Sequence, residues 1–125
     1  MDAISRVRAL SEVVSNLSHI PDVLVAMVVS AADGLIVETS PIKGGAIGGG
    51  DSRKHTAALA AYLYSKVTRA SDTARLGVPA FMRLEAEQGH ICIVGAREVV
   101  LVTIVTPGAN LGRVRLDMMQ AARGN

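Results

Sequence analysis

Aromatic residues are almost absent from this chain of 125 residues. There is no tryptophan, and only Tyr62, Tyr64 and Phe81 carry an aromatic ring. Proteins that hold single-stranded nucleic acid stack its bases on aromatic side chains, and this sequence offers no visible stacking platform. The core must therefore be built from Val, Ile, Leu, Ala and Met.

The chain also has little cysteine, and its positive and negative charges nearly balance. Cys92 is the only cysteine, which excludes a disulfide within the chain and is compatible with a reducing compartment. The net charge is +2, and the basic residues are mixed with acidic ones rather than gathered in a run that could follow a phosphate backbone. We therefore expect no disulfide framework and no nucleic-acid partner.

Long apolar runs are missing as well. The longest, residues 23–29 and 99–105, have the length of a strand rather than the roughly 20 residues of a spanning helix. The N-terminus carries Asp2 and Arg6 and has the pattern of a helix rather than of a secretory signal. We expect one cytoplasmic domain over residues 1–125, without membrane insertion.

Three segments have the periodicity of an amphipathic helix. Residues 3–20 place apolar side chains at intervals of three and four up to Pro21, which disfavours helical geometry at the preceding residue. A middle helix is expected over residues 53–75, with residue 51 or 52 as its N-cap. Asn110 is the expected N-cap of the last helix, whose apolar stripe continues to the end of the chain.

Strand patterns fill the remaining sequence. Asp33 and Gly34 are expected to form a two-residue hairpin turn, because glycine tolerates the left-handed backbone that such a turn requires. Residues 79–87 alternate strictly between an apolar face and a largely charged one. The expected strands cover residues 23–31, 35–39, 79–87, 90–95 and 99–105.

The two faces of each strand predict its place in the sheet. Residues 23–31 and 99–105 are apolar on both faces and should be central, whereas residues 79–87, with one charged face, suit an edge. We predict an α+β fold with a five-stranded, mostly antiparallel sheet in the order 2-1-5-4-3, leaving the direction of the central pair open. The first and last helices should share one face and the middle helix should cover the other.

These features resemble the roadblock / dynein light chain family. The resemblance lies in the strand-Asp-Gly-strand segment 25–37, the middle helix, the last strand 99–105, and Asn110-Leu111-Gly112 at the start of the final helix. It implies a profilin-like, roadblock fold that forms homodimers or heterodimers, with two sheets joined edge to edge and the middle helices together on one face. It also implies a platform or regulator for Ras-like small GTPases, as in the bacterial gliding-motility regulators, or an adaptor in motor and signalling assemblies.

The middle helix and the edge strand indicate a partner independently of the resemblance. A stripe that includes Leu59, Leu63 and Val67 is expected to rest on the sheet, while the opposite positions lack the charges of a free surface. An uncovered strand edge also invites pairing with another chain. Phe81 is expected to pack beneath the middle helix of either subunit. The alternative for the middle helix is an ordinary exposed alanine face, and the alternative for Phe81 is that it covers its own helix.

We therefore predict a two-fold homodimer joined along the strand at residues 79–87. Its predicted interface residues are Ala57, Ala61, Tyr64, Thr68, Phe81, Arg83 and Glu85.

No motif indicates catalysis. The glycine-rich segment 44–50 is followed by Asp51-Ser52 rather than by the Gly-Lys-Ser/Thr of a nucleotide loop, so a flexible connector is expected and its role stays open. Three histidines, His19, His55 and His90, have no metal-ligand spacing, and Cys92 has the setting of a buried hydrophobe. We expect no catalytic residue, no metal site and no cofactor.

The expected function is a non-enzymatic, homodimeric binding module that regulates or scaffolds a Ras-like small GTPase through the paired middle helices. The predicted partner-binding residues are Arg53, Lys54, Tyr64 and Arg69. A structural adaptor without a GTPase partner is the first alternative, and a small-ligand sensor with a pocket between sheet and helix is the second. The identity of the partner, the direction of regulation and the choice between homodimer and heterodimer stay open.

Overall fold

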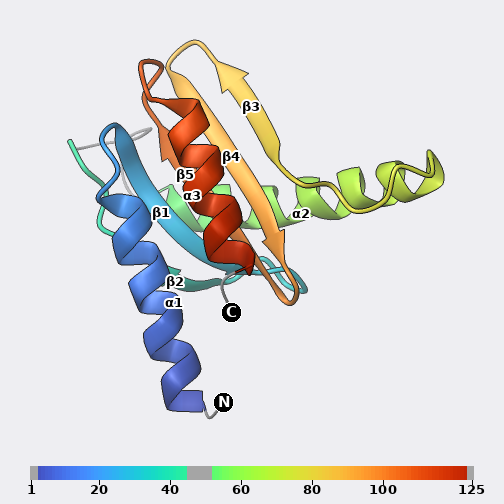
Figure 1. The fold of residues 1–125 in the computed structure, drawn as a ribbon, viewed down its shortest axis with the longest axis horizontal. Coiled ribbons are helices and arrows are strands. Elements are labelled where there is room, and N and C mark those ends of the chain that lie inside the picture. The colour runs from blue at the N-terminus through green and yellow to red at the C-terminus, as the bar shows by residue number, and fades with distance from the viewer. Residues whose placement is uncertain (1–2, 45–51, 124–125) are drawn as a thin grey trace.

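The computed structural model describes residues 3–44 and 52–123, with side chains described from residue 9 onward. Helices and strands follow one another in the predicted order (Figure 1). The elements are α1 (Ala3–Ser18), β1 (Val23–Ser30), β2 (Ile36–Thr39), α2 (Arg53–Thr73), β3 (Met82–Ala86), β4 (Gly89–Ala96), β5 (Val99–Val105) and α3 (Leu111–Arg123).

The five strands form one sheet in the order β2-β1-β5-β4-β3, which confirms the predicted order. Every neighbouring pair is antiparallel, including the central pair β1 and β5, whose direction the sequence left open. Met27 of β1 and Val102 of β5 lie opposite each other and are fully buried. Strands that are apolar on both faces occupy the centre because only there are both faces covered.

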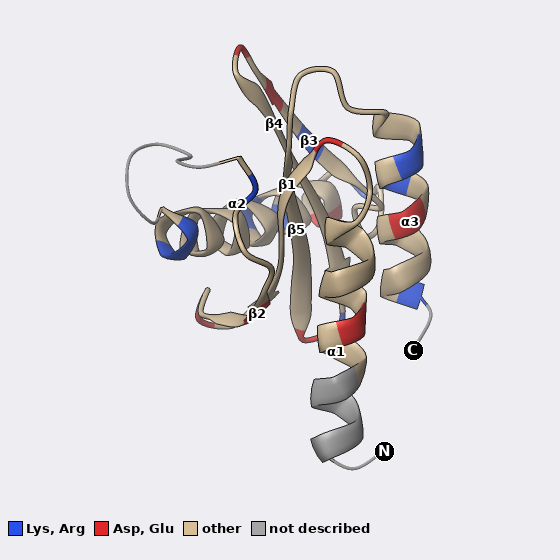
Figure 2. Ribbon diagram, turned by 90° about the vertical axis from the view of Figure 1, so that its left-hand side faces the viewer, with Lys and Arg blue, Asp and Glu red and all other residues tan. Residues whose placement is uncertain are grey.

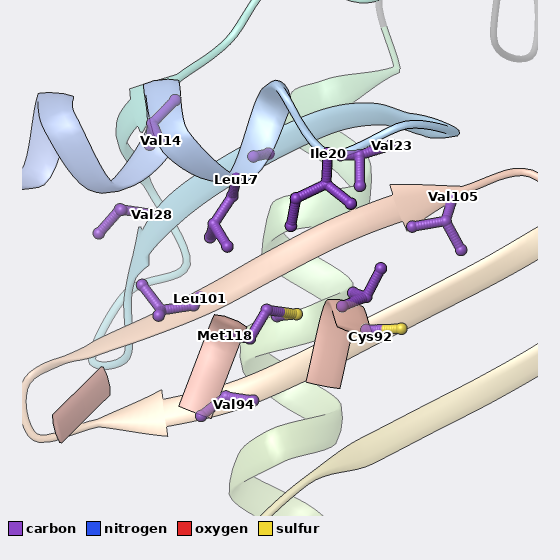
Figure 3. Packing of buried hydrophobic residues seen from close by; sticks show 12 residues of the cluster. Val14, Leu17, Ile20, Val23, Val28, Cys92, Val94, Leu101, Val105 and Met118 are labelled. Atoms are coloured by element: carbon purple, nitrogen blue, oxygen red, sulfur yellow. The ribbon is translucent and has the colours of Figure 1, made fainter. Parts of the chain in front are cut away.

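The helices form two layers around the sheet, as predicted. Figure 2 shows α1 and α3 on one side and α2 on the other. On the first side, Leu17 and Met118 pack over Val28 and Cys92 (Figure 3). On the second side, the small side chains of α2 pack over a separate cluster that includes Met27. Each layer thus buries one face of the same central strands.

The connection between β1 and β2 is longer than two residues, so the prediction of a two-residue turn was wrong. It spans residues 31–35, and the Ser30 N–H donates to the Leu35 carbonyl at 2.9 Å. Asp33 Oδ1 accepts the Leu35 N–H at 3.1 Å, and this bond, followed by one from the Ser30 side chain, lowers the pKa of the Asp33 carboxyl. Gly34 adopts the expected left-handed backbone, with φ of 74°. The side-chain bond of Asp33 closes a wider loop than the dipeptide alone predicts.

Asn110 caps α3 as the sequence predicts. Its Oδ1 accepts the backbone N–H of Arg113 at 3.1 Å, which satisfies one of the free amides at the helix start. Asn110→Ala should lower the free energy of unfolding by about 1 kcal/mol in urea denaturation. Asn110→Ser, which keeps a capping oxygen, should change it by only a few tenths. Equal losses from both substitutions would contradict a capping role.

Candidate interaction surface

The middle helix rests on the sheet through its alanines. Ala57, Ala60 and Ala61 of α2 are buried, and α2 contacts β1, β5 and β4. The helix also approaches the loop between β1 and β2 closely: a Cβ placed on Gly34 of that loop would lie 3.0 Å from the Cα of Ala58. Large side chains would hold the helix away from the sheet at this distance. The expectation that Ala57 and Ala61 lie on an exposed dimer face was therefore wrong.

Tyr64 and Thr68 continue the same side of α2. Tyr64 is half-buried beside Ile93, in the same cluster as Met27. Its ring occupies the place that a Cβ on Gly95 would take. Thr68 Oγ1 is buried and has no hydrogen-bond partner among the described residues. Neither side chain belongs to the outward face of the helix, so the side of α2 on which the sequence placed them is corrected.

Large apolar side chains elsewhere on α2 are exposed instead. We call Leu59, Tyr62, Leu63 and Val67 the outer stripe; their exposed fractions range from 36% to 60%. The Lys66 ammonium lies 5.3 Å from the centroid of the Tyr62 ring, which covers one part of the stripe with a cation. Leu59, Leu63 and Val67, which were expected to rest on the sheet, are thus exposed.

The second half of α2 extends beyond the sheet. Its buried residues end at Ala61, and Figure 1 shows the helix continuing past β3, the edge strand. Leu76 and Val78, on the segment that returns to β3, are 78% and 77% exposed. Leu84 of β3, opposite Ile91 on the side of the sheet that α2 covers, is 46% exposed. Exposed apolar side chains of this size around one edge mark a surface built for contact.

The other side of β3 carries charge. Arg83 and Glu85 are exposed and form an ion pair, with Arg83 Nη2 3.4 Å from Glu85 Oε2. Phe81 precedes the strand on this same side and packs against the cluster beneath α1 and α3, with the Arg115 guanidinium carbon 5.6 Å from its ring centroid. The expectation that Phe81 packs beneath the middle helix was wrong, because strand alternation turns it towards the opposite face.

The predicted partner-binding residues differ in their availability. Lys54 and Arg69 are exposed on α2. Arg53 Nη1 donates to the Ser40 carbonyl at 3.0 Å and so joins the start of α2 to the end of β2. Tyr64 lies against the sheet, as described above. Most of the glycine-rich segment 44–50 lies outside the described residues.

The described residues give no sign of a reactive centre. No three His, Cys, Asp or Glu side chains gather there as metal ligands would. Burial raises the pKa of the Cys92 thiol, against weaker opposing effects of a hydrogen bond from Thr103 and the charge of Arg83. A raised pKa keeps the thiol protonated and unreactive. No helix in the described ranges is long and apolar enough to cross a membrane.

Comparison with known proteins identifies the architecture. Residues 9–106 match the family model described as Roadblock/LC7 domain. No curated protein matches the chain in sequence.

Solved structures share the fold at low identity. A Roadblock/LC7 domain from Streptomyces avermitilis has 23% identity and a TM-score of 0.74, with 92% of both chains covered. Myxococcus xanthus MglB has 17% identity and a TM-score of 0.81, covering 98% of this chain and 89% of that one. The gliding protein MglB from Thermus thermophilus has 15% identity and a TM-score of 0.80, with 98% and 87% covered. At such identities the likeness concerns the fold alone.

Proposed function

Because the chain belongs to the Roadblock/LC7 domain family, we propose that it is a non-enzymatic binding module that acts as a homodimer and regulates or scaffolds a Ras-like small GTPase. The outer stripe of α2 is the observation that carries this proposal. Four large apolar side chains are exposed on α2, and their removal from water by a partner would lower the free energy of the complex. A binding surface, rather than a reactive side chain, is what this helix offers.

The two ends of the surface suit different contacts. Leu84 and the part of α2 beyond β3 lie at the sheet edge, where a second copy can extend the sheet. Lys54 and Arg69 are exposed on α2 and add positive charge to the apolar face. A GTPase surface with acidic residues around an apolar centre would complement it, since complementary charge raises association rates and selects partners.

Regulation is proposed to work by holding the GTPase rather than by donating a catalytic group. Arg69 is the exposed arginine within α2, and Arg53 is bound to the Ser40 carbonyl. If an arginine of this chain stabilised the transferring phosphate, its replacement by alanine would reduce GTP hydrolysis while leaving binding intact. Under the proposal, the substitution of Arg69 changes binding and hydrolysis together.

Tyr62→Asp should weaken GTPase binding by at least about tenfold, because it places a carboxylate at the centre of an apolar contact and removes an aromatic anchor. The affinity is measured by calorimetry against a Ras-like GTPase recovered from native lysate, loaded with GDP or with a non-hydrolysable GTP analogue. Leu116→Asp is the matched control, since Leu116 on α3 is 55% exposed but lies on the opposite side of the sheet.

Equal affinities for the Tyr62→Asp variant, the control and the unchanged protein would exclude the outer stripe as the GTPase site. If no Ras-like GTPase binds in either nucleotide state although the protein is dimeric, the structural adaptor becomes the better assignment.

A further inference from the structure

We infer that β3 recognises a second copy of this chain in a single register, with Arg83 of each copy opposite Glu85 of the other and Leu84 opposite its own counterpart. The inference rests on the homodimer of the proposed function. It adds the residues that select a like partner and the alignment in which the two strands meet.

The direction of the free backbone groups follows from the hydrogen bonds of the sheet centre. Thr106 N–H donates to the Asp22 carbonyl at 2.9 Å, just outside the pair formed by Val23 and Val105. In an antiparallel ladder, hydrogen-bonded and non-hydrogen-bonded residue pairs alternate. A hydrogen bond between the residues just outside a pair therefore marks that pair as non-hydrogen-bonded. The N–H and C=O of Val105 therefore point away from β1 and towards β4.

The alternation can be followed outward to the edge. Val105 pairs with His90 of β4. The N–H and C=O of His90 therefore form their hydrogen bonds with Val105 and point towards β5. His90 in turn pairs with Glu85 of β3, so that pair does not exchange hydrogen bonds. The N–H and C=O of Glu85, and those of Arg83 two residues earlier, therefore point outward from the sheet. No described strand pairs with β3 on that side.

These free groups permit an axis at each position of β3, and an axis through position 83, 84 or 85 pairs at least three of the five residues of the strand. A two-fold axis can pass through position 83, 84 or 85 of the two antiparallel strands. The first places Arg83 opposite Arg83, and the third places Glu85 opposite Glu85, in each case bringing like charges together. An axis through Leu84 makes two Arg83-Glu85 pairs instead, and opposite charges across strands stabilise whereas like charges destabilise. Leu84 is also the midpoint of Met82–Ala86, so this alignment pairs the whole of β3.

The same alignment suits both faces of the joined sheet. On one face, the ion pair within each β3 becomes part of an alternating group of four charges. On the other face, the two half-exposed Leu84 side chains become direct neighbours, about 4.5 to 5.5 Å apart between their Cβ atoms. The part of α2 that extends beyond β3 then lies over the sheet of the second copy rather than over water. A second copy therefore covers both the charged and the apolar part of this edge.

Disulfide trapping tests the register directly. In a Cys92→Ala background, Leu84→Cys should form a covalent dimer under mild oxidation, because directly opposite residues that do not exchange hydrogen bonds have Cα atoms about 4.5 Å apart. Arg83→Cys and Glu85→Cys report the two competing alignments. Met82→Cys is the control: in the proposed register its counterpart lies about 14 Å away along the strand, too far for a disulfide.

Charge reversal tests the recognition. Arg83→Glu alone, or Glu85→Arg alone, converts both opposite-charge pairs into like-charge pairs and should raise the dimer dissociation constant at least about tenfold. Mixing the two variants should give a heterodimer with both pairs restored, and the double variant R83E/E85R should dimerise like the unchanged protein. The masses are measured by analytical ultracentrifugation. Failure of the mixture and of the double variant to recover would overturn the proposed charge pairing.

The outcomes separate this inference from the proposed function. A one-subunit mass of the unchanged protein at micromolar concentration would overturn the homodimer itself. A two-subunit mass with trapping at position 83 or 85, or at none of the three positions, would overturn the register while leaving the homodimer standing.

Discussion

Ala57→Leu is expected to lower the free energy of unfolding by about 2 kcal/mol, the cost of forcing a larger side chain into a packed contact. Ala57 is fully buried where α2 meets the sheet. There is no spare space between α2 and nearby Gly34, because even a Cβ on Gly34 would lie 3.0 Å from the Cα of Ala58. The added branch must therefore lift the helix or distort its neighbours.

Ala70→Leu provides the matched control, since Ala70 is exposed on the same helix. The same chemical change there should alter stability by less than about 0.5 kcal/mol, as most surface substitutions do. Urea unfolding followed by circular dichroism measures both variants. If Ala57→Leu proved neutral, the close contact between α2 and the sheet would be disproved, and the large residues of the helix would have to face the sheet instead.

Gly95→Val is expected to destabilise the protein by a similar amount, about 2 kcal/mol, although valine is a better strand former than glycine. A Cβ on Gly95 would overlap the hydroxyl and ring of Tyr64. Tyr64 must then swing away from the sheet and give up its half-buried position beside Ile93. Because the buried alanines end at Ala61, Tyr64 is the next anchor along α2.

The sign of this effect should reverse when the tyrosine is removed. In a Tyr64→Ala background, Gly95→Val meets no ring and should be neutral or stabilising, because the higher strand propensity of valine is then unopposed. A double-mutant cycle in urea measures the coupling between the two positions. An equal loss in both backgrounds would show that the cost at Gly95 arises from the strand and not from Tyr64.

The contact between Tyr64 and Gly95 also matters for the proposed function. Tyr64 belongs to the last part of α2 that touches the sheet, and Leu59 and Tyr62 of the outer stripe lie on the opposite side of the same helix. A change in the tilt of α2 would move Tyr62 and Val67 relative to the sheet edge. The packed alanines and Tyr64 thus hold the surface that a partner is proposed to contact.

Much of the architecture follows from the sequence. Strands 23–31 and 99–105 are apolar on both faces, and burial of both faces requires a central place in the sheet. The alternation at residues 79–87 indicated an edge strand, and β3 is that edge. Asn110 was identifiable as a cap because its short side chain can accept an amide hydrogen of the following turn. Such features depend on a few neighbouring residues, so they can be predicted from short stretches of sequence.

Tertiary structure alone decided which side of α2 faces the sheet. The helix has small residues on one side and large apolar residues on the other, so its periodicity permits both orientations. Close packing selects the small side, because α2 closely approaches Gly34 of the β1–β2 loop and Gly95 of β4, which lie outside the helix in sequence. The side on which Phe81 packs depends in the same way on where α1 and α3 lie. Sequence periodicity determined the elements and their order, whereas close packing between distant segments determined which surface is left for a partner.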